Sequence, residues 1–216
     1  MRLKNSLIAA LLATGLLAGA AQASTFLSST FEVTVANFDA GGDRNNAFAG
    51  PANLLPRIDE TFTYTGALDF NLGSGGSSTT TIFDFLNSGS GTFSGLSTAL
   101  GNSILSTPTW GMTTLFRFRD FDLGGFAGNI RHDDGIKFFD NGMIETDSPA
   151  PTTVINSAFD FSGGNFQLFY AAANGNPSVL EVTGTPAPVP LPAALPLLLA
   201  GLGGLGLMRR RKNKTT

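Results

Sequence analysis

The stretch TFTYTGALDFNL, residues 61–72, alternates apolar and polar side chains. In an extended chain, successive side chains point to opposite faces, so its even-numbered apolar residues share one face. These residues are Phe62, Tyr64, Leu68, Phe70 and Leu72. Alternation of this kind predicts β-structure with one buried face. The same pattern recurs in residues 31–35, 116–119, 159–161 and 166–170.

Glycine- and asparagine-rich breakers separate these segments, at residues 41–43, 73–78, 141–142, 163–165 and 174–177. Dense turn signals between alternating segments predict an all-β antiparallel sandwich or barrel. We expect a single, jelly-roll-like β-sandwich domain over residues 24–184, with one short helix around residues 82–86 or 94–105. The alternative is two small domains divided at residues 73–80, each of which would have to fold without a disulfide or a metal.

Composition excludes several classes of protein. Hydrophobic residues make up 42% of the 216 residues, which is enough to bury a core and excludes wholesale disorder. The chain has no cysteine and one histidine. It therefore has neither a disulfide framework nor a cysteine- or histidine-based zinc site.

The N-terminal residues predict a secretory signal peptide over residues 1–23. Basic Arg2 and Lys4 precede an apolar run, and Ala21 and Ala23 form a small-x-small cleavage site before Ser24. A buried first helix is the alternative. We expect export through the Sec machinery and a mature chain that begins at Ser24.

The C-terminal residues predict a membrane anchor. A proline-rich linker covers residues 185–192, an apolar run covers 193–208, and a basic tail covers 209–216. The apolar run is slightly shorter than the roughly 20 residues of a straight transmembrane helix. Basic residues stay on the cytoplasmic side, so this tail would keep its end inside while the body is outside.

The order of these C-terminal elements resembles the VPLPA variant of the PEP-CTERM sorting signal. Its motif is Val189, Pro190, Leu191, Pro192 and Ala193, and its basic cluster is Arg209, Arg210, Arg211 and Lys212. Such tails occur in Gram-negative bacteria that make extracellular polysaccharide. The resemblance implies an exosortase partner that cleaves at the motif. It also implies an inner-membrane intermediate, followed by a cell-surface or extracellular place in a biofilm matrix. A plain tail anchor is the alternative.

The formal net charge of −3 is the sum of a strongly acidic body and basic terminal segments. Only six of the 13 basic residues lie in residues 24–184, whereas all 16 acidic residues do, so this part carries −10. An acidic body disfavours nucleic-acid binding, because phosphates need positive charge, and it suits divalent cations.

Residues 130–142 hold the least usual local composition, IRHDDGIKFFDNG. Two adjacent ionised carboxylates repel each other unless they are separated or share a cation. Oxygen ligands from carboxylates and loop carbonyls are those that Ca²⁺ requires. Asp133 and Asp134 are therefore candidate metal or ligand residues. The alternative is that Asp133-Asp134-Gly135 is only a hairpin turn.

The segment from His132 to Gly142, together with residues 164–170 and 177–182, resembles the protective-antigen-type β-sandwich of bacterial toxins, glycosidases and adhesins. In adhesin members, adjacent aspartates hold a calcium ion that binds sugar hydroxyls. The resemblance therefore implies Ca²⁺ at Asp133 and Asp134 and polysaccharide as a partner.

Catalytic signals are weak, and we expect a non-enzymatic protein with no catalytic residues. His132 could serve a Ser-His-Asp triad, yet no Gly-x-Ser-x-Gly elbow is present, and a solvated or loop-bracing role fits its position in a turn. A secreted hydrolase that acts on polysaccharide through a carboxylate pair is the alternative function.

Overall fold

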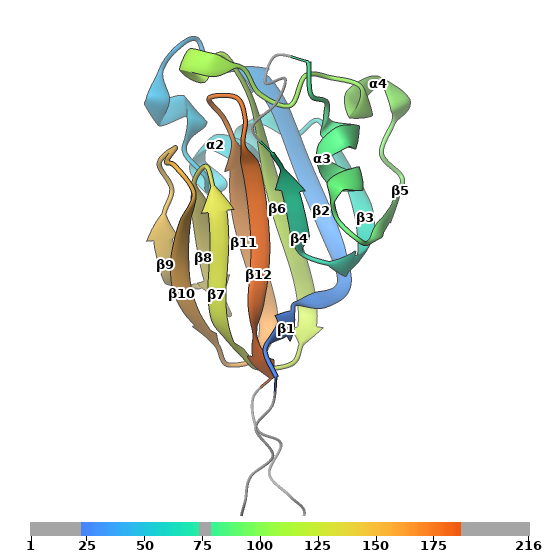
Figure 1. Ribbon diagram of the computed structural model, residues 1–216, viewed down its shortest axis with the longest axis vertical. Coiled ribbons are helices and arrows are strands. Elements are labelled where there is room, and N and C mark those ends of the chain that lie inside the picture. The colour runs from blue at the N-terminus through green and yellow to red at the C-terminus, as the bar shows by residue number, and fades with distance from the viewer. Residues whose placement is uncertain (1–22, 74–78, 187–216) are drawn as a thin grey trace, which may run out of the picture. The chain divides into compact units, whose positions relative to one another are not determined.

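The computed structural model describes residues 23–73 and 79–186, which form an antiparallel β-sandwich (Figure 1). This confirms the expected all-β class. Residues 1–22 of the expected signal peptide, the sorting motif, the expected transmembrane helix and the basic tail lie outside the described residues. Within the described ranges, no helix has both the length and the apolar character needed to cross a bilayer.

Two sheets face each other. The larger sheet has the strand order β5-β3-β2-β6-β11-β8-β9. Its strands are β2 (Ser28–Asp39), β3 (Glu60–Ala67), β5 (Thr92–Ser94), β6 (Met112–Leu123), β8 (Ile136–Asp140), β9 (Met143–Ser148) and β11 (Gly164–Ala172). The smaller sheet has the order β1-β12-β7-β10, and β4 also pairs with β12. Its strands are β1 (Thr25–Phe26), β4 (Asp69–Leu72), β7 (Phe126–Asp133), β10 (Ile155–Phe161) and β12 (Ser178–Pro186).

Helical segments are short and lie between strands. They are α2 (Pro51–Leu54), α3 (Ile82–Ser88), α4 (Thr98–Gly101) and the 3-10 turns η2 (Arg44–Ala47), η3 (Leu55–Arg57) and η4 (Pro108–Trp110). The helix expected at residues 82–86 is confirmed as α3. It begins with a reciprocal capping box between Thr81 and Asp84, which satisfies backbone N–H groups at its start. In the span 94–105, where a helix was the other possibility, only the four residues of α4 are α-helical.

The stretch 61–72 serves both sheets. It is not one strand, because β3 ends at Ala67 in the larger sheet and β4 begins at Asp69 in the smaller one. Gly66, one residue before the end of β3, has φ of 150°, and a Cβ atom there would collide with Gly91. The alternation nevertheless persists through the crossing, because Phe62, Tyr64, Leu68 and Phe70 are all buried.

The core between the sheets is built from aromatic rings. Phe118 lies at its centre, with ring centroids of Phe70, Phe116, Phe31 and Tyr64 at 5.6, 6.0, 6.3 and 6.4 Å. All five side chains are buried. Aromatic pairs at these separations stabilise a core beyond the area that they bury.

A second apolar cluster covers the outer face of the larger sheet. It comprises Ala36, Ala49, Leu54, Leu115, Phe169 and Ala171. Ala49 and Leu54 belong to the segment around α2, which therefore packs against this outer face. Phe169 thus departs from the expectation that all the aromatics of its strand face one way.

Asp133-Asp134-Gly135 is not a hairpin turn. It joins β7 of the smaller sheet to β8 of the larger sheet, so the chain crosses the sandwich here. The crossing lies at the same end as the loop between β11 and β12, whereas β1 and the end of β12 meet at the opposite end (Figure 1).

Substitution of Phe118 by alanine should lower the free energy of unfolding by about 3–5 kcal/mol, because it leaves a cavity among four packed rings. Phe121 is a matched control on the same strand, since it is 59% exposed. Phe121→Ala should cost less than about 1 kcal/mol. Urea unfolding of the purified variants measures both values, and equal losses would contradict the assigned core.

Candidate functional site

The crossing at residues 133–135 docks onto the end of β11. The backbone N–H of Asp134 donates to the carbonyl of Ala171 at 3.2 Å, and the N–H of Ala171 donates to the carbonyl of Gly135 at 2.9 Å. The Tyr170 hydroxyl donates to the carbonyl of Asp133 at 2.5 Å. These bonds hold the crossing against a strand that is itself anchored in the core.

Gly135 is required by a close approach of backbone. A Cβ atom at this position would collide with the carbonyl group of Pro149, which lies in the loop between β9 and β10. That loop therefore lies directly on the crossing. The Asp-Asp-Gly order places the two carboxyl groups immediately before the one residue that this packing restricts to glycine.

Asp133 and Asp134 are buried residues, at 6% and 2% exposure. They hydrogen-bond to each other, and a cis peptide bond joins the two residues. Backbone N–H groups of Ala173, at 2.7 Å, and of Thr152 donate to the Asp134 carboxyl. Burial raises the pKa of Asp133 to about 6, and burial plus the neighbouring Asp133 raises the pKa of Asp134 to about 9.

His132 braces the crossing from inside. It is fully buried, and its Nδ1 lies 2.6 Å from the carbonyl oxygen of Asp134 while its Nε2 lies 2.9 Å from Ser157 Oγ. A carbonyl only accepts, so Nδ1 carries the proton and Nε2 accepts from the serine. Burial lowers the pKa of His132, which favours this neutral form. The loop-bracing interpretation fits this geometry, and the solvated one does not.

The carboxyl pair has the chemistry of a hard-cation site. Among the described residues, the three ion pairs are Arg117–Glu32, Arg131–Glu181 and Lys137–Asp147, so neither Asp133 nor Asp134 has a basic partner there. Two buried carboxylates in contact must share either a proton or a cation. Over the same residues no group of three acidic or histidine side chains has metal-binding geometry. A Ca²⁺ ion would therefore take its other ligands from loop carbonyls, amide oxygens and water.

The separation of the two carboxyl groups can be compared with that in a polysaccharide hydrolase, the alternative function. Glycosidases separate their two carboxyl groups by about 5–9.5 Å. Asp133 and Asp134 are in hydrogen-bond contact and do not have that separation. The Ser157 hydroxyl is hydrogen-bonded to one ring nitrogen of His132. The other ring nitrogen bonds the backbone carbonyl of Asp134, where a Ser-His-Asp triad would have a carboxylate.

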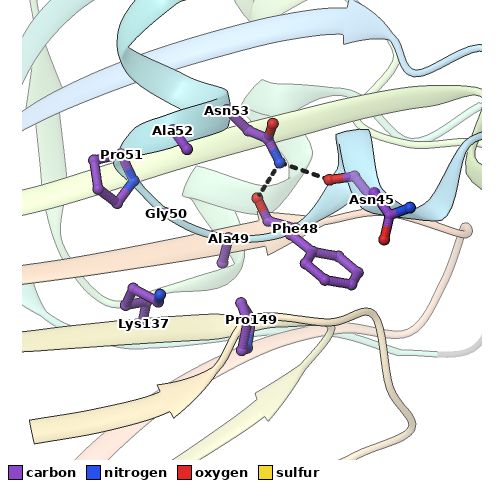
Figure 2. A pocket seen from close by; sticks show the side chains of 9 residues that line it. All are labelled: Asn45, Phe48, Ala49, Gly50, Pro51, Ala52, Asn53, Lys137 and Pro149. Carbon is purple, nitrogen blue, oxygen red and sulfur yellow. Dashed lines mark hydrogen bonds between the residues drawn. The ribbon is translucent and has the colours of Figure 1, made fainter. Parts of the chain in front are cut away.

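Two surface cavities lie near the crossing. One, of about 370 Å³, is lined by Arg44, Trp110, Pro151, Thr152, Thr153 and Asn174. The other, of about 310 Å³, is lined mainly by Phe48, by small residues of the segment around α2 and by Lys137 (Figure 2). The Asn53 amide there already donates to the carbonyls of Asn45 and Phe48, and Lys137 is paired with Asp147.

Sequence reasoning found the carboxyl pair but not the first cavity. Its walls come from four separate loops, whose residues are up to 130 positions apart. Non-glycine residues with positive φ, which are uncommon, mark two of these loops at Thr109, Trp110 and Asn174. The breakers at residues 41–43 and 174–177 mark the loops that carry Arg44 and Asn174, but nothing in the sequence shows that these loops meet.

No family model matches the chain, and no curated protein matches it. Among solved structures it is similar to the PA14 domain of the MpAFP antifreeze protein. That match has 16% identity and a TM-score of 0.45, over 76% of this chain and 86% of that one. It is also similar to a PA14 sugar-binding domain from an RTX adhesin, with 14% identity and a TM-score of 0.44, over 71% of this chain and 88% of that one. Residue roles do not transfer at such identities, so the site rests on its own geometry.

In metal-free buffer, stability should fall as pH rises from about 5 to 9. The folded pKa values of both aspartates lie above the ordinary 3.8, so the folded state binds more protons than the unfolded state in this range. One such proton gives a slope of about −1.4 kcal/mol per pH unit. Asp134→Asn should remove most of the slope in urea unfolding between pH 6 and 9.

Asp160 provides the control, because it is exposed on β10. Asp160→Asn should leave the pH profile parallel to that of the wild type. A parallel profile for Asp134→Asn as well would show that the pair does not carry raised pKa values.

Proposed function

We propose that this chain is an exported surface or matrix protein whose β-sandwich binds carbohydrate through a Ca²⁺ ion held by Asp133 and Asp134. The observation that carries this proposal is the buried, mutually hydrogen-bonded carboxyl pair at a cluster of loops, with no basic partner among the described residues. The resemblance of residues 132–142 to the calcium-holding segment of sugar-binding adhesins supports the same chemistry.

The roles of the chain's own residues follow from the contacts. Asp133 and Asp134 supply hard oxygen ligands, and the N–H groups of Ala173 and Thr152 orient the Asp134 carboxyl. His132 and Tyr170 hold the backbone of the crossing in place. When bound, Ca²⁺ supplies a positive centre that can accept sugar hydroxyl oxygens as ligands.

The proposal of export and sorting is based on the N-terminal and C-terminal residues of the sequence. Basic and apolar N-terminal residues before Ser24 support secretion, and the motif Val189–Ala193 with its basic cluster supports recognition by an exosortase. The body has the charge of an extracellular cation-binding domain, because all 16 acidic residues fall within it. We place the mature protein at the cell surface or in the surrounding polysaccharide.

Calcium titration by calorimetry should show one site that disappears in Asp133→Asn and persists in Asp160→Asn. Binding should be tighter at pH 8 than at pH 5.5 and should release protons, because the ligands must lose them first. A glycan array should give signals that a chelator abolishes. Signals that are flat with and without chelator would overturn the carbohydrate function and leave a purely structural matrix role.

Replacement of Pro190, Leu191 and Pro192 by alanine should leave uncleaved protein in the inner membrane. The motif would be lost while the apolar run and the basic cluster remain. Cell fractionation with intact-mass analysis measures both the location and the cleavage sites. Normal arrival of the variant at the surface or in the medium would show that the tail is a plain anchor.

A further inference from the structure

The cavity lined by Arg44, Trp110, Thr152 and Asn174 lies beside the carboxyl pair. Two backbone N–H groups in or next to its walls show that the cavity and the pair are close. The N–H of Thr152 donates to the Asp134 carboxyl, and so does the N–H of Ala173, the residue before Asn174. A volume of about 370 Å³ falls within the usual range of small-molecule sites, roughly 300–1,000 Å³. A ligand in the cavity would thus be a close neighbour of a cation at the pair.

Arg44 gives this cavity a fixed positive charge. Its Nη2 donates to the carbonyl of Pro151 at 2.9 Å, and its guanidinium lies 6.0 Å from the ring centroid of Phe48. Arg44 takes part in none of the three ion pairs found in residues 23–73 and 79–186. Like Arg57 and Arg119, Arg44 has no carboxylate partner among the described residues, and it is the one of these three that lines this cavity. Its remaining donors suit a planar anion.

The other walls supply neutral hydrogen-bond donors and a flat apolar surface. The Asn174 Oδ1 accepts from the N–H of Thr109 at 2.9 Å, so the NH₂ of the same amide is turned away from that bond and can donate. Trp110 packs against Ala40, Ala47 and Ala173, which fixes the plane of its indole. An indole face offers the dispersion contacts that the C–H face of a pyranose ring can use.

We propose that this cavity binds an acidic sugar, a uronic acid residue of a polysaccharide, with its carboxylate on Arg44 and its hydroxyls toward the cation at Asp133 and Asp134. This inference rests on the proposed calcium-dependent carbohydrate binding. The cation is needed because the body carries −10 and would otherwise repel an anionic polymer. Arg44 then distinguishes an acidic sugar from a neutral one, because the guanidinium gains a charge-assisted bond only with the carboxylate.

The test uses trigalacturonate and trimannuronate, each compared with its methyl ester, which keeps the hydroxyls and removes the charge. Calorimetry is carried out with a fixed calcium concentration and again with chelator. Wild-type protein should bind at least one acid about five- to tenfold more tightly than its ester, as a charge-assisted bond at an exposed arginine provides. Arg44→Gln should abolish this preference, because the acid loses its charge-assisted bond and then binds no more tightly than its ester. Arg57→Gln is the matched control, because Arg57 lies over Phe38 and does not line the cavity.

The outcomes separate the two proposals. Calcium-dependent binding of esters and acids with equal affinity would overturn the acidic-sugar assignment and leave carbohydrate binding intact. An acid preference that persists in Arg44→Gln would overturn the role of this cavity. No binding of any of the four ligands, with calcium binding retained, would overturn the acidic-sugar assignment, and a glycan array that is also flat would overturn the carbohydrate function.

Discussion

Two adjacent carboxyl groups are buried where the chain crosses from one sheet to the other, and the site depends on how their charge is balanced. At 6% and 2% exposure, Asp133 and Asp134 cannot both be ionised without a strong energetic cost. A shared proton removes one charge, and a divalent cation compensates both. The shared proton is favoured at low pH, and the proposed cation would compete with it for the same pair.

The surrounding structure keeps the pair in place through backbone contacts. Tyr170 holds the carbonyl of Asp133, His132 holds the carbonyl of Asp134, and Ala173 donates to the Asp134 carboxyl. Tyr170 belongs to the aromatic core, where its ring lies 5.4 Å from that of Phe85. The position of the carboxyl pair is therefore coupled to the packing between the sheets. Loss of core packing should loosen the site even where no ligand residue is changed.

Period-two alternation was sufficient to predict the fold class and most of the core. The buried residues of the stretch 61–72 face the core as expected, even though the stretch is divided between two sheets after Ala67. The pattern failed at Phe169, because the segment around α2 covers the outer face of the larger sheet and makes a second apolar surface there. Alternation describes one strand at a time and contains no information about which loop folds back over a sheet.

One part of the candidate site could likewise be predicted from neighbouring residues in the sequence, whereas the other part depends on contacts between distant loops. Asp133 and Asp134 are neighbours in sequence, so the repulsion between their carboxylates is evident from the order of residues alone. Arg44, Trp110 and Asn174 lie on separate loops and come together only because several strands end at the same edge of the sandwich. Sequence could not show that Arg44 lacks an acidic partner among the described residues, because that property depends on every loop that packs near it.

The first described strand and the end of the last one lie away from these loops. β1 pairs with the last residues of β12, at Phe26 and Thr183, whereas Asp133 pairs with Val179 near the start of β12. β12 extends from Ser178 to Pro186, which at about 3.3 Å per residue separates its two ends by roughly 26 Å. Residues at both limits of the body thus lie at the end opposite the carboxyl pair.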